Sequence, residues 1–207
     1  MRIAVFFVGN RLMLDDGIGP AVYDYIVENY NFGNETSANE VPANVHPSSE
    51  QVATSKATTS SIVQSTVDMF DVGCMTLDMV SKVNEYDLLI TVDAVDGTDA
   101  EPGTVFRYEP YDIARAAGAR TSLHELKLAD LFDAATMLGF EAEGLCFGMQ
   151  VENLEPVEFV EGLTPKVKER MPFLAETVIA ELSRRGCSIA RKDGTCVDTL
   201  QEHISTP

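Results

Sequence analysis

Basic residues are scarce in this chain of 207 residues, which carries 15 lysines and arginines against 33 aspartates and glutamates. The formal net charge at pH 7 is therefore −18. Proteins that hold nucleic acid neutralise its phosphates with lysine and arginine, so this balance argues against a nucleic-acid partner. It argues equally against binding to an anionic membrane surface.

Long apolar runs are also missing. No stretch approaches the roughly 18 apolar residues that a membrane-spanning helix needs. The apolar start of the chain, residues 1–9, is too short for a signal peptide and is interrupted at once by Asn10 and Arg11. We therefore expect a cytoplasmic protein with no membrane partner.

The four cysteines lie far apart and never as C-x-x-C, so they indicate no structural zinc site and require no disulfides. We expect free thiols at Cys74, Cys146, Cys187 and Cys196. A Walker lysine and the G-x-G-x-x-G spacing are absent too, which disfavours nucleotide binding.

Hydrophobic residues make up 45% of the chain, ample for a packed core, and short apolar runs alternate with amphipathic segments. Runs typical of strands occupy residues 2–8, 67–71, 86–95, 103–108 and 145–151. Stripes typical of helices occupy residues 19–30, 76–83, 126–138 and 165–185. This alternation predicts an α/β fold, a three-layer sandwich with a mostly parallel central sheet and helices on both faces.

The last of these helices has the clearest boundaries. Thr164 is placed to be its N-cap, and Gly186 follows its end. Pro172 inside it predicts a kink or a broken first turn.

Two segments fall outside this pattern. Residues 33–66 contain 12 serines and threonines in 34 positions and show no sustained apolar periodicity, which is typical of a flexible insertion. Residues 187–207 also lack periodicity, and we expect a disordered C-terminal tail there. The remainder predicts one α/β domain over residues 1–186 that carries the insertion.

Carboxylates and a histidine follow three of the expected elements. Asp15 and Asp16 lie in the loop after the first strand, Asp71 closes the second strand, and His124 precedes the helix at 126–138. Ligands of parallel sheets gather at the carboxyl ends of strands. Two carboxylates and an imidazole suit nickel, zinc, cobalt or iron, so Asp16, Asp71 and His124 are the candidate metal ligands. Residue types alone leave a simpler interpretation open, because aspartates before a helix are commonly N-caps.

Residues 8–20 (VGNRLMLDDGIGP) closely resemble the N-terminal motif of the nickel–iron hydrogenase maturation endopeptidases. These proteases remove a C-terminal extension from the precursor of the hydrogenase large subunit. Four further segments resemble that family in order and spacing: 70–73 (FDVG), 92–94 (VDA), 123–130 (LHELKLAD) and 153–165 (NLEPVEFVEGLTP).

The resemblance implies a function and a site. Carried over by position, the family's nickel-contacting residues fall on Asp16, Asp71 and His124, which would then be both the catalytic and the metal-contacting residues. The nickel would belong to the precursor rather than to the free enzyme, so that only a metal-loaded large subunit is cleaved. The resemblance also implies the phosphorylase/hydrolase-like fold of that family. We expect a monomer, and we expect Gly9, Asn10, Asp15 and Gly17 to shape its first loop.

Two departures from the family keep alternatives open. Where many relatives have Gly-Thr, this chain has Gly73 and Cys74, and its insertion is longer than usual. Cys74 raises the alternative of a thiol nucleophile with His124 as base and Asp71 orienting it. Other functions to weigh are a non-catalytic, metal-sensing assembly chaperone of the same fold, and a related peptidase acting on another protein, such as the spore-germination type.

Overall fold

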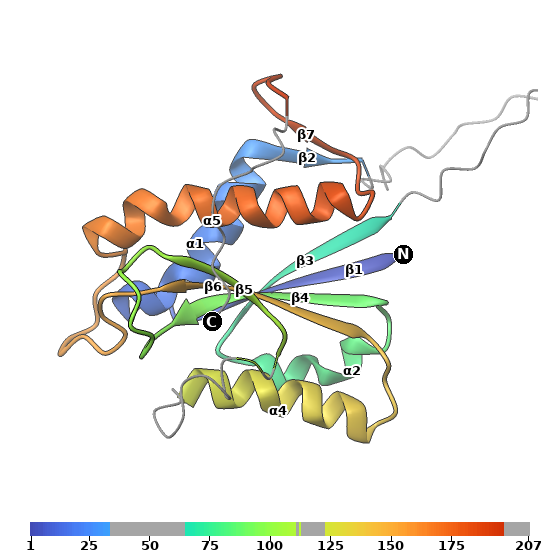
Figure 1. The fold of residues 1–207 in the computed structure, drawn as a ribbon, viewed down its shortest axis with the longest axis horizontal. Helices are drawn as coiled ribbons and strands as arrows, with labels where there is room; N and C mark the ends of the chain where they lie inside the picture. Colours follow the sequence, from blue (N-terminus) through green and yellow to red (C-terminus); the bar gives the residue numbers. More distant parts are fainter. Residues whose placement is uncertain (34–64, 111, 113–122, 197–207) are drawn as a thin grey trace, which may run out of the picture.

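The computed structural model describes residues 1–33, 65–110, 112 and 123–196, apart from the side chains of Thr76 and of residues 123–129. Its centre is a five-stranded sheet in the order β3-β1-β4-β6-β5 (Figure 1). The strands are β1 (Arg2–Val8), β3 (Thr66–Gly73), β4 (Leu88–Val95), β5 (Val105–Tyr108) and β6 (Glu143–Gln150). The first four in this order run parallel, and only β5 is antiparallel to its neighbour β6. The predicted, mostly parallel sheet is therefore confirmed.

Helices cover both faces of the sheet. Helices α1 (Ile18–Asn29) and α5 (Pro165–Arg184) pack on one face, and α2 (Val80–Val83) and α4 (Leu123–Met137) on the other (Figure 1). Side chains of β1 alternate between the two cores, because Phe7 packs with α1 and α5 while Phe6 packs with α2 and α4. This is the three-layer α/β sandwich that the alternation of segments predicts.

Close backbone contact fixes the start of α1 against the sheet. A Cβ atom on Gly19 would lie 2.1 Å from the backbone oxygen of Val8 and 2.8 Å from that of Val92. Only glycine allows the first turn of α1 to approach β1 and β4 so closely. The loop between β1 and α1 is consequently held at the edge where both strands end.

The predicted helices are found with altered boundaries. The segment at 76–83 splits into a 3-10 helix, η2 (Thr76–Met79), and the short α2. Helix α5 begins directly after Thr164 and continues unbroken through Pro172, so the predicted break in its first turn is wrong. Among the described helices, none is both long enough and apolar enough to cross a membrane.

The expected tail differs from the structure over its first part. Residues 189–191 form β7 (Ile189–Arg191), which pairs antiparallel with β2 (Tyr30–Phe32) in a separate two-stranded sheet. Glu176 of α5 accepts a hydrogen bond from Tyr30 Oη at 2.5 Å and pairs with Arg191 at 2.5 Å. These contacts are what order a segment without periodicity of its own, whereas residues 197–207 lie outside the described chain.

The insertion at 33–66 falls mostly on residues 34–64, which also lie outside the described residues. Its flanks are described and both attach to the segment after α5. Gly33 N donates to Ser188 O at 2.8 Å, and Ser65 N donates to Gly186 O at 3.2 Å. The two ends of the insertion are thus held by the same stretch of chain.

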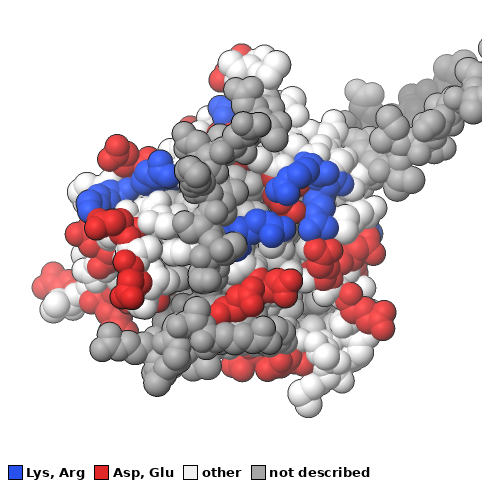
Figure 2. Space-filling model, viewed as in Figure 1, with Lys and Arg blue, Asp and Glu red and all other residues white. Residues whose placement is uncertain are grey.

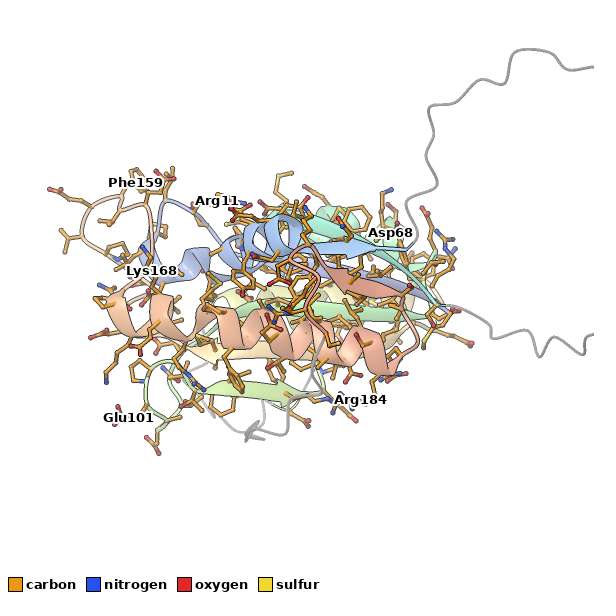
Figure 3. The ribbon with its side chains drawn as sticks, turned by 90° about the horizontal axis from the view of Figure 1, so that it is seen from above. Arg11, Asp68, Glu101, Phe159, Lys168 and Arg184 are labelled. Atoms are coloured by element: carbon orange, nitrogen blue, oxygen red, sulfur yellow. The ribbon has the colours of Figure 1, made fainter. Side chains whose placement is uncertain are left out.

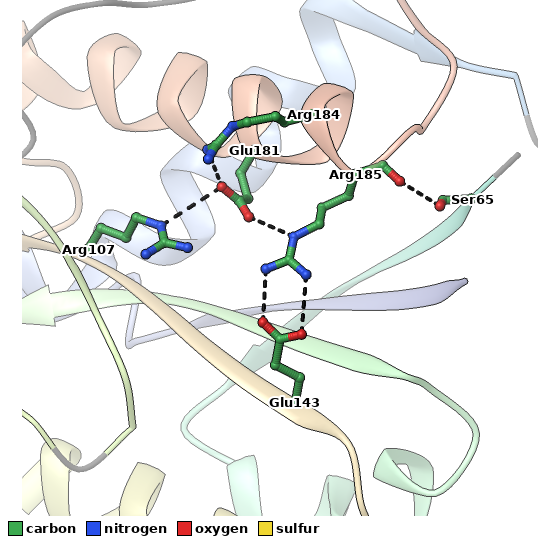
Figure 4. A network of polar contacts seen from close by, with 6 residues as sticks. All are labelled: Ser65, Arg107, Glu143, Glu181, Arg184 and Arg185. Carbon is green, nitrogen blue, oxygen red and sulfur yellow. Dashed lines mark hydrogen bonds and ion pairs between the residues drawn. The ribbon is translucent and has the colours of Figure 1, made fainter.

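A buried carboxylate closes α5 onto the edge of the sheet where the parallel strands begin (Figure 4). Glu181, only 1% exposed, accepts a hydrogen bond from Arg185 Nε at 2.9 Å and also pairs with Arg184 and Arg107. Arg185 reaches on to Glu143 at 2.9 Å and lowers the pKa of that carboxyl by hydrogen bonding. Because the folded pKa of Glu143 is lowered, this pair stabilises the fold above the ordinary glutamate pKa and loses its contribution as pH falls.

Candidate active site

The carboxyl ends of the parallel strands meet at one edge of the sheet, and the segment after β1 crosses this edge. Gly9 has a φ of +132°, and a Cβ there would lie 1.8 Å from the backbone oxygen of Asp16. Gly9 N also donates to Gly73 O at the end of β3, at 3.1 Å. The glycine therefore lets the first loop close on itself and on the neighbouring strand, as expected of a residue that shapes this loop.

Asp16 lies at the inner side of the first loop. It belongs to the 3-10 helix η1 (Leu14–Gly17) and is 2% exposed, and its Oδ2 accepts a hydrogen bond from Asn10 N at 2.9 Å. Leu14, two residues before it, has a φ of +53°, an uncommon conformation for a residue with a Cβ. Strain of this kind persists where surrounding contacts hold it, and Leu14 N donates to Val160 O at 2.9 Å.

Asp15 has a different role from its neighbour. It is fully buried, and its carboxylate accepts four hydrogen bonds from the segment between β6 and α5. The donors are Glu152 N at 3.1 Å, Asn153 N at 3.0 Å, and Thr164 N and Oγ1 at 2.7 and 2.9 Å. Thr164 stands at the N-cap position of α5, as predicted, but its hydroxyl binds Asp15 rather than capping the helix. Asp15 therefore ties both ends of that segment to the first loop.

Asp71 is oriented by an arginine. Its side chain is 28% exposed, and Oδ2 accepts a hydrogen bond from an Arg11 guanidinium nitrogen at 2.7 Å. Arg11 also binds Asp24 of α1, with one contact at 3.0 Å. The hydrogen bonds that Arg11 donates to Asp24 and, to a lesser extent, to Asp71 raise the pKa of Arg11 above its ordinary value, so the guanidinium stays charged at any working pH.

A surface pocket of about 480 Å³ opens beside this ion pair. Its wall includes Gly9, Asn10, Arg11, Asp71 and Cys74. Cys74 is exposed, so a thiol does lie at the rim of the pocket as the departure from the family motif suggests. Asp71 thus lies in the wall of a surface hollow, next to Arg11 and Cys74.

His124 lies in the first turn of α4, so it is inside the helix rather than before it. Helix α4 leads into β6 and packs against η2, which follows β3, so its first turn is at the same edge of the sheet. The side chain of His124 lies outside the described residues. Within the described part of the chain, no three His, Cys, Asp or Glu side chains form a group arranged to hold a metal.

The structure thus brings two of the three predicted residues to one segment. Asp16 binds the backbone of Asn10, and Asp71 binds the side chain of Arg11. Arg11 is the residue that sequence reasoning missed. The sequence contains one weak indication of its role: Arg11 is the only basic residue of the first loop, and two aspartates follow it.

Comparisons with known proteins show which family the chain belongs to. A sequence model of the hydrogenase maturation protease family matches residues 52–181. The hydrogenase expression/formation protein HupD of Rhizobium leguminosarum bv. viciae is 30% identical over 205 residues, which cover 98% of this chain and 85% of that protein. The HupD protein of Thiocapsa roseopersicina is 31% identical over 148 residues, and the match spans 70% of this chain and 65% of that relative.

A solved structure shares the fold. The hydrogenase maturating endopeptidase HybD from E. coli superposes with a TM-score of 0.70, covering 94% of this chain and 100% of that one at 23% identity. The predicted fold class is confirmed, and so is the predicted kind of enzyme at the level of the family. The chain belongs to the family of hydrogenase maturation proteases, which are endopeptidases.

Proposed function

We propose that this protein removes the C-terminal extension from a nickel-loaded precursor of a hydrogenase large subunit. Asp16, Asp71 and His124 contact the nickel that the precursor carries, and the free enzyme holds no tightly bound metal of its own. The enzyme works as a monomer in the cytoplasm, with the precursor rather than nucleic acid or a membrane as its partner. The observation that carries this proposal is the approach of Asp16 and Asp71 to one short segment, Gly9–Arg11, beside a pocket.

The environments of the two carboxylates differ in a way that suits this task. Asp16 is buried and fixed by the backbone of Asn10, so it offers a carboxylate of constant geometry. Asp71 is partly exposed at the pocket, where an incoming group can reach it. Two carboxylates and an imidazole bind a borderline metal without matching the hold of thiolates, so the precursor's own thiolates can keep the nickel. The enzyme therefore senses the metal and does not extract it.

The reaction itself is hydrolysis of one peptide bond. Water adds to the scissile carbonyl, the C–N bond breaks, and the leaving amine takes a proton. The carboxylate of Asp71 lines the pocket and can accept the proton of the attacking water, whereas Asp16 is 2% exposed and does not line the pocket. The nickel of the substrate fixes the cleavage site relative to these groups.

The decisive experiment compares two forms of one substrate. Purified enzyme is incubated with the large-subunit precursor loaded with nickel and with the same precursor free of nickel, and intact mass is measured by mass spectrometry. We expect loss of a C-terminal peptide from the nickel-loaded form only. Equal cleavage of both forms would contradict nickel recognition.

The same measurement tests the alternatives. A stable complex of enzyme and nickel-loaded precursor without any loss of mass would support a non-catalytic assembly chaperone. Absence of both binding and cleavage would favour a peptidase for another protein. Each outcome is read from the mass of the large subunit and from its elution with the enzyme.

Arg11 is expected to protect Asp71 from free metal ions. Its guanidinium occupies Oδ2 of Asp71 and places a positive charge beside it. Arg11→Gln should therefore raise the apparent affinity of the free enzyme for Ni²⁺ by about tenfold, as measured by isothermal titration calorimetry at low salt.

Asp24→Asn provides the matched control for Arg11→Gln. It removes one carboxylate partner of Arg11 but leaves the positive charge next to Asp71. The Ni²⁺ affinity of Asp24→Asn should stay close to that of the wild type. Equal affinities of Arg11→Gln and wild type would show that Arg11 does not shield the carboxylate.

A further inference from the structure

Two of the most exposed apolar side chains of the described chain stand close together on one loop. Residues 152–164 connect β6 to α5 and are called here the β6–α5 loop. Within it Val157 is 103% exposed and Phe159 is 78% exposed. A valine and a phenylalanine that stay in water at a loop tip do not stabilise the fold by burial, and neighbouring exposed apolar side chains of this kind are typical of a surface that contacts a partner.

The apolar surface continues onto the first loop. Val160 N donates to Leu12 O at 3.0 Å and Leu14 N donates to Val160 O, so the two loops run side by side as a short bridge. Val160 is 41% exposed and Leu12 is 50% exposed. These two together with Val157 and Phe159 are called here the apolar tip.

The loop that carries most of the apolar tip is acidic, and the nearest basic residues lie beside it, Arg11 in the first loop and Lys166 and Lys168 at the start of α5. The β6–α5 loop contains four glutamates and neither lysine nor arginine, and all four are exposed: Glu152, Glu155, Glu158 and Glu161. Figure 2 shows acidic side chains along the left edge of this face, where the loop lies in Figure 1, together with a group of basic side chains above most of them. Such a rim repels an anionic membrane, and a second copy of this chain would bring the same negative charges against it. It fits a different protein whose apolar hollow is bordered by lysine or arginine.

The apolar tip is fixed relative to the candidate active site. Asp15 binds the loop at Glu152, Asn153 and Thr164, and Asp16 is its neighbour in η1. Figure 3 shows Phe159 and Arg11 at the same edge of the molecule. A partner seated on the tip is therefore positioned relative to Asp16 and Asp71 without a flexible connection.

We propose that the apolar tip is the docking surface for the precursor protein. It inserts into an apolar hollow of the precursor, flanked by basic side chains, and holds the metal-bearing segment in front of the pocket. This inference rests on the proposed function and names the contact that selects its substrate. Docking of this kind contributes to binding and not to the chemical step, so it affects KM rather than kcat.

The test is a pair of double variants assayed on nickel-loaded precursor. In the first, Val157→Ser and Phe159→Ser remove the apolar tip; we expect KM to rise by about tenfold or more, with kcat nearly unchanged. The control carries Met137→Ser and Leu138→Ser, which are 88% and 59% exposed at the end of α4 and away from the β6–α5 loop. The control should keep the wild-type KM. Circular dichroism should show both variants folded, because all four side chains are largely in water.

Binding of the intact precursor, measured by biolayer interferometry, separates this proposal from the proposed function. Wild-type binding that the first variant loses would support the docking surface even if no cleavage occurred, in which case only the peptidase proposal would fail. A KM and an affinity of the first variant equal to those of the wild type would overturn the docking surface. A wild-type dimer that the first variant dissociates in sedimentation would also overturn it, because the partner would then be a second copy.

Discussion

Asp71→Asn is expected to reduce cleavage of the nickel-loaded precursor by about 100-fold or more. The substitution keeps the shape of the side chain but removes the negative charge that faces the pocket and binds Arg11. An amide is a poorer metal ligand than a carboxylate and does not accept the proton of an attacking water. The measurement is single-turnover cleavage followed by mass spectrometry.

The matched control for Asp71→Asn is Asp68→Asn on the same strand. Asp68 lies on β3 three residues before Asp71. It is exposed and accepts a hydrogen bond from Tyr86 Oη at 3.0 Å. The Asp68→Asn variant loses one negative charge from the same strand, but Asp68 does not line the pocket, so the cleavage rate should remain near that of the wild type. Asp16→Asn should lose as much activity as Asp71→Asn. Undiminished cleavage by either site variant would remove that residue from the mechanism.

Asp15→Ala is expected to lower the free energy of unfolding by about 3 kcal/mol. The carboxylate is fully buried and accepts four hydrogen bonds, and its removal leaves three backbone N–H groups and one hydroxyl without their acceptor. The β6–α5 loop should loosen at both ends at once. Urea denaturation followed by circular dichroism measures the loss.

Two further variants serve as controls for Asp15→Ala: Asp15→Asn at the same position and Asp24→Ala at the surface. Asparagine keeps one acceptor oxygen at position 15, so Asp15→Asn should lower the free energy of unfolding by less than Asp15→Ala does. Asp24 is 56% exposed in its side chain and pairs with Arg11 at the surface, so Asp24→Ala should cost less than about 1 kcal/mol. If Asp15→Ala were no more costly than Asp24→Ala, the buried carboxylate would not be what holds the loop.

Much of the fold could be predicted because its strands are buried on both faces. Every residue of β4 is buried, and the run LLITVDAV is correspondingly apolar throughout except for Thr91 and Asp93. A short run of this kind, rich in β-branched residues, is typical of a central strand in a sheet covered on both faces. The short strands β2 and β7 could not be predicted, because three residues carry no periodicity and their pairing depends on Tyr30, Glu176 and Arg191 meeting in space.

The candidate site, too, could be predicted only in part from the sequence. Asp16 and Asp71 could be placed at one edge of the sheet because each follows or ends a predicted parallel strand. The difference between Asp15 and Asp16 could not be predicted, since neighbours in sequence face different partners in the folded loop. The pairing of Arg11 with Asp71 was equally out of reach, because it joins residues 60 positions apart.

The polar network around Glu181 lies at the opposite edge of the sheet from Asp16 and Asp71, where Glu143 begins β6 and Ser65 precedes β3. Distant sites with no shared partners contribute independently to the free energy of unfolding. Substitutions in the network around Glu181 should therefore change the free energy of unfolding without altering the candidate site. Changes over evolution in the arginines around Glu181 can thus alter the tolerance of the protein to heat or acid, while the edge of the sheet that carries Asp16 and Asp71 keeps its geometry.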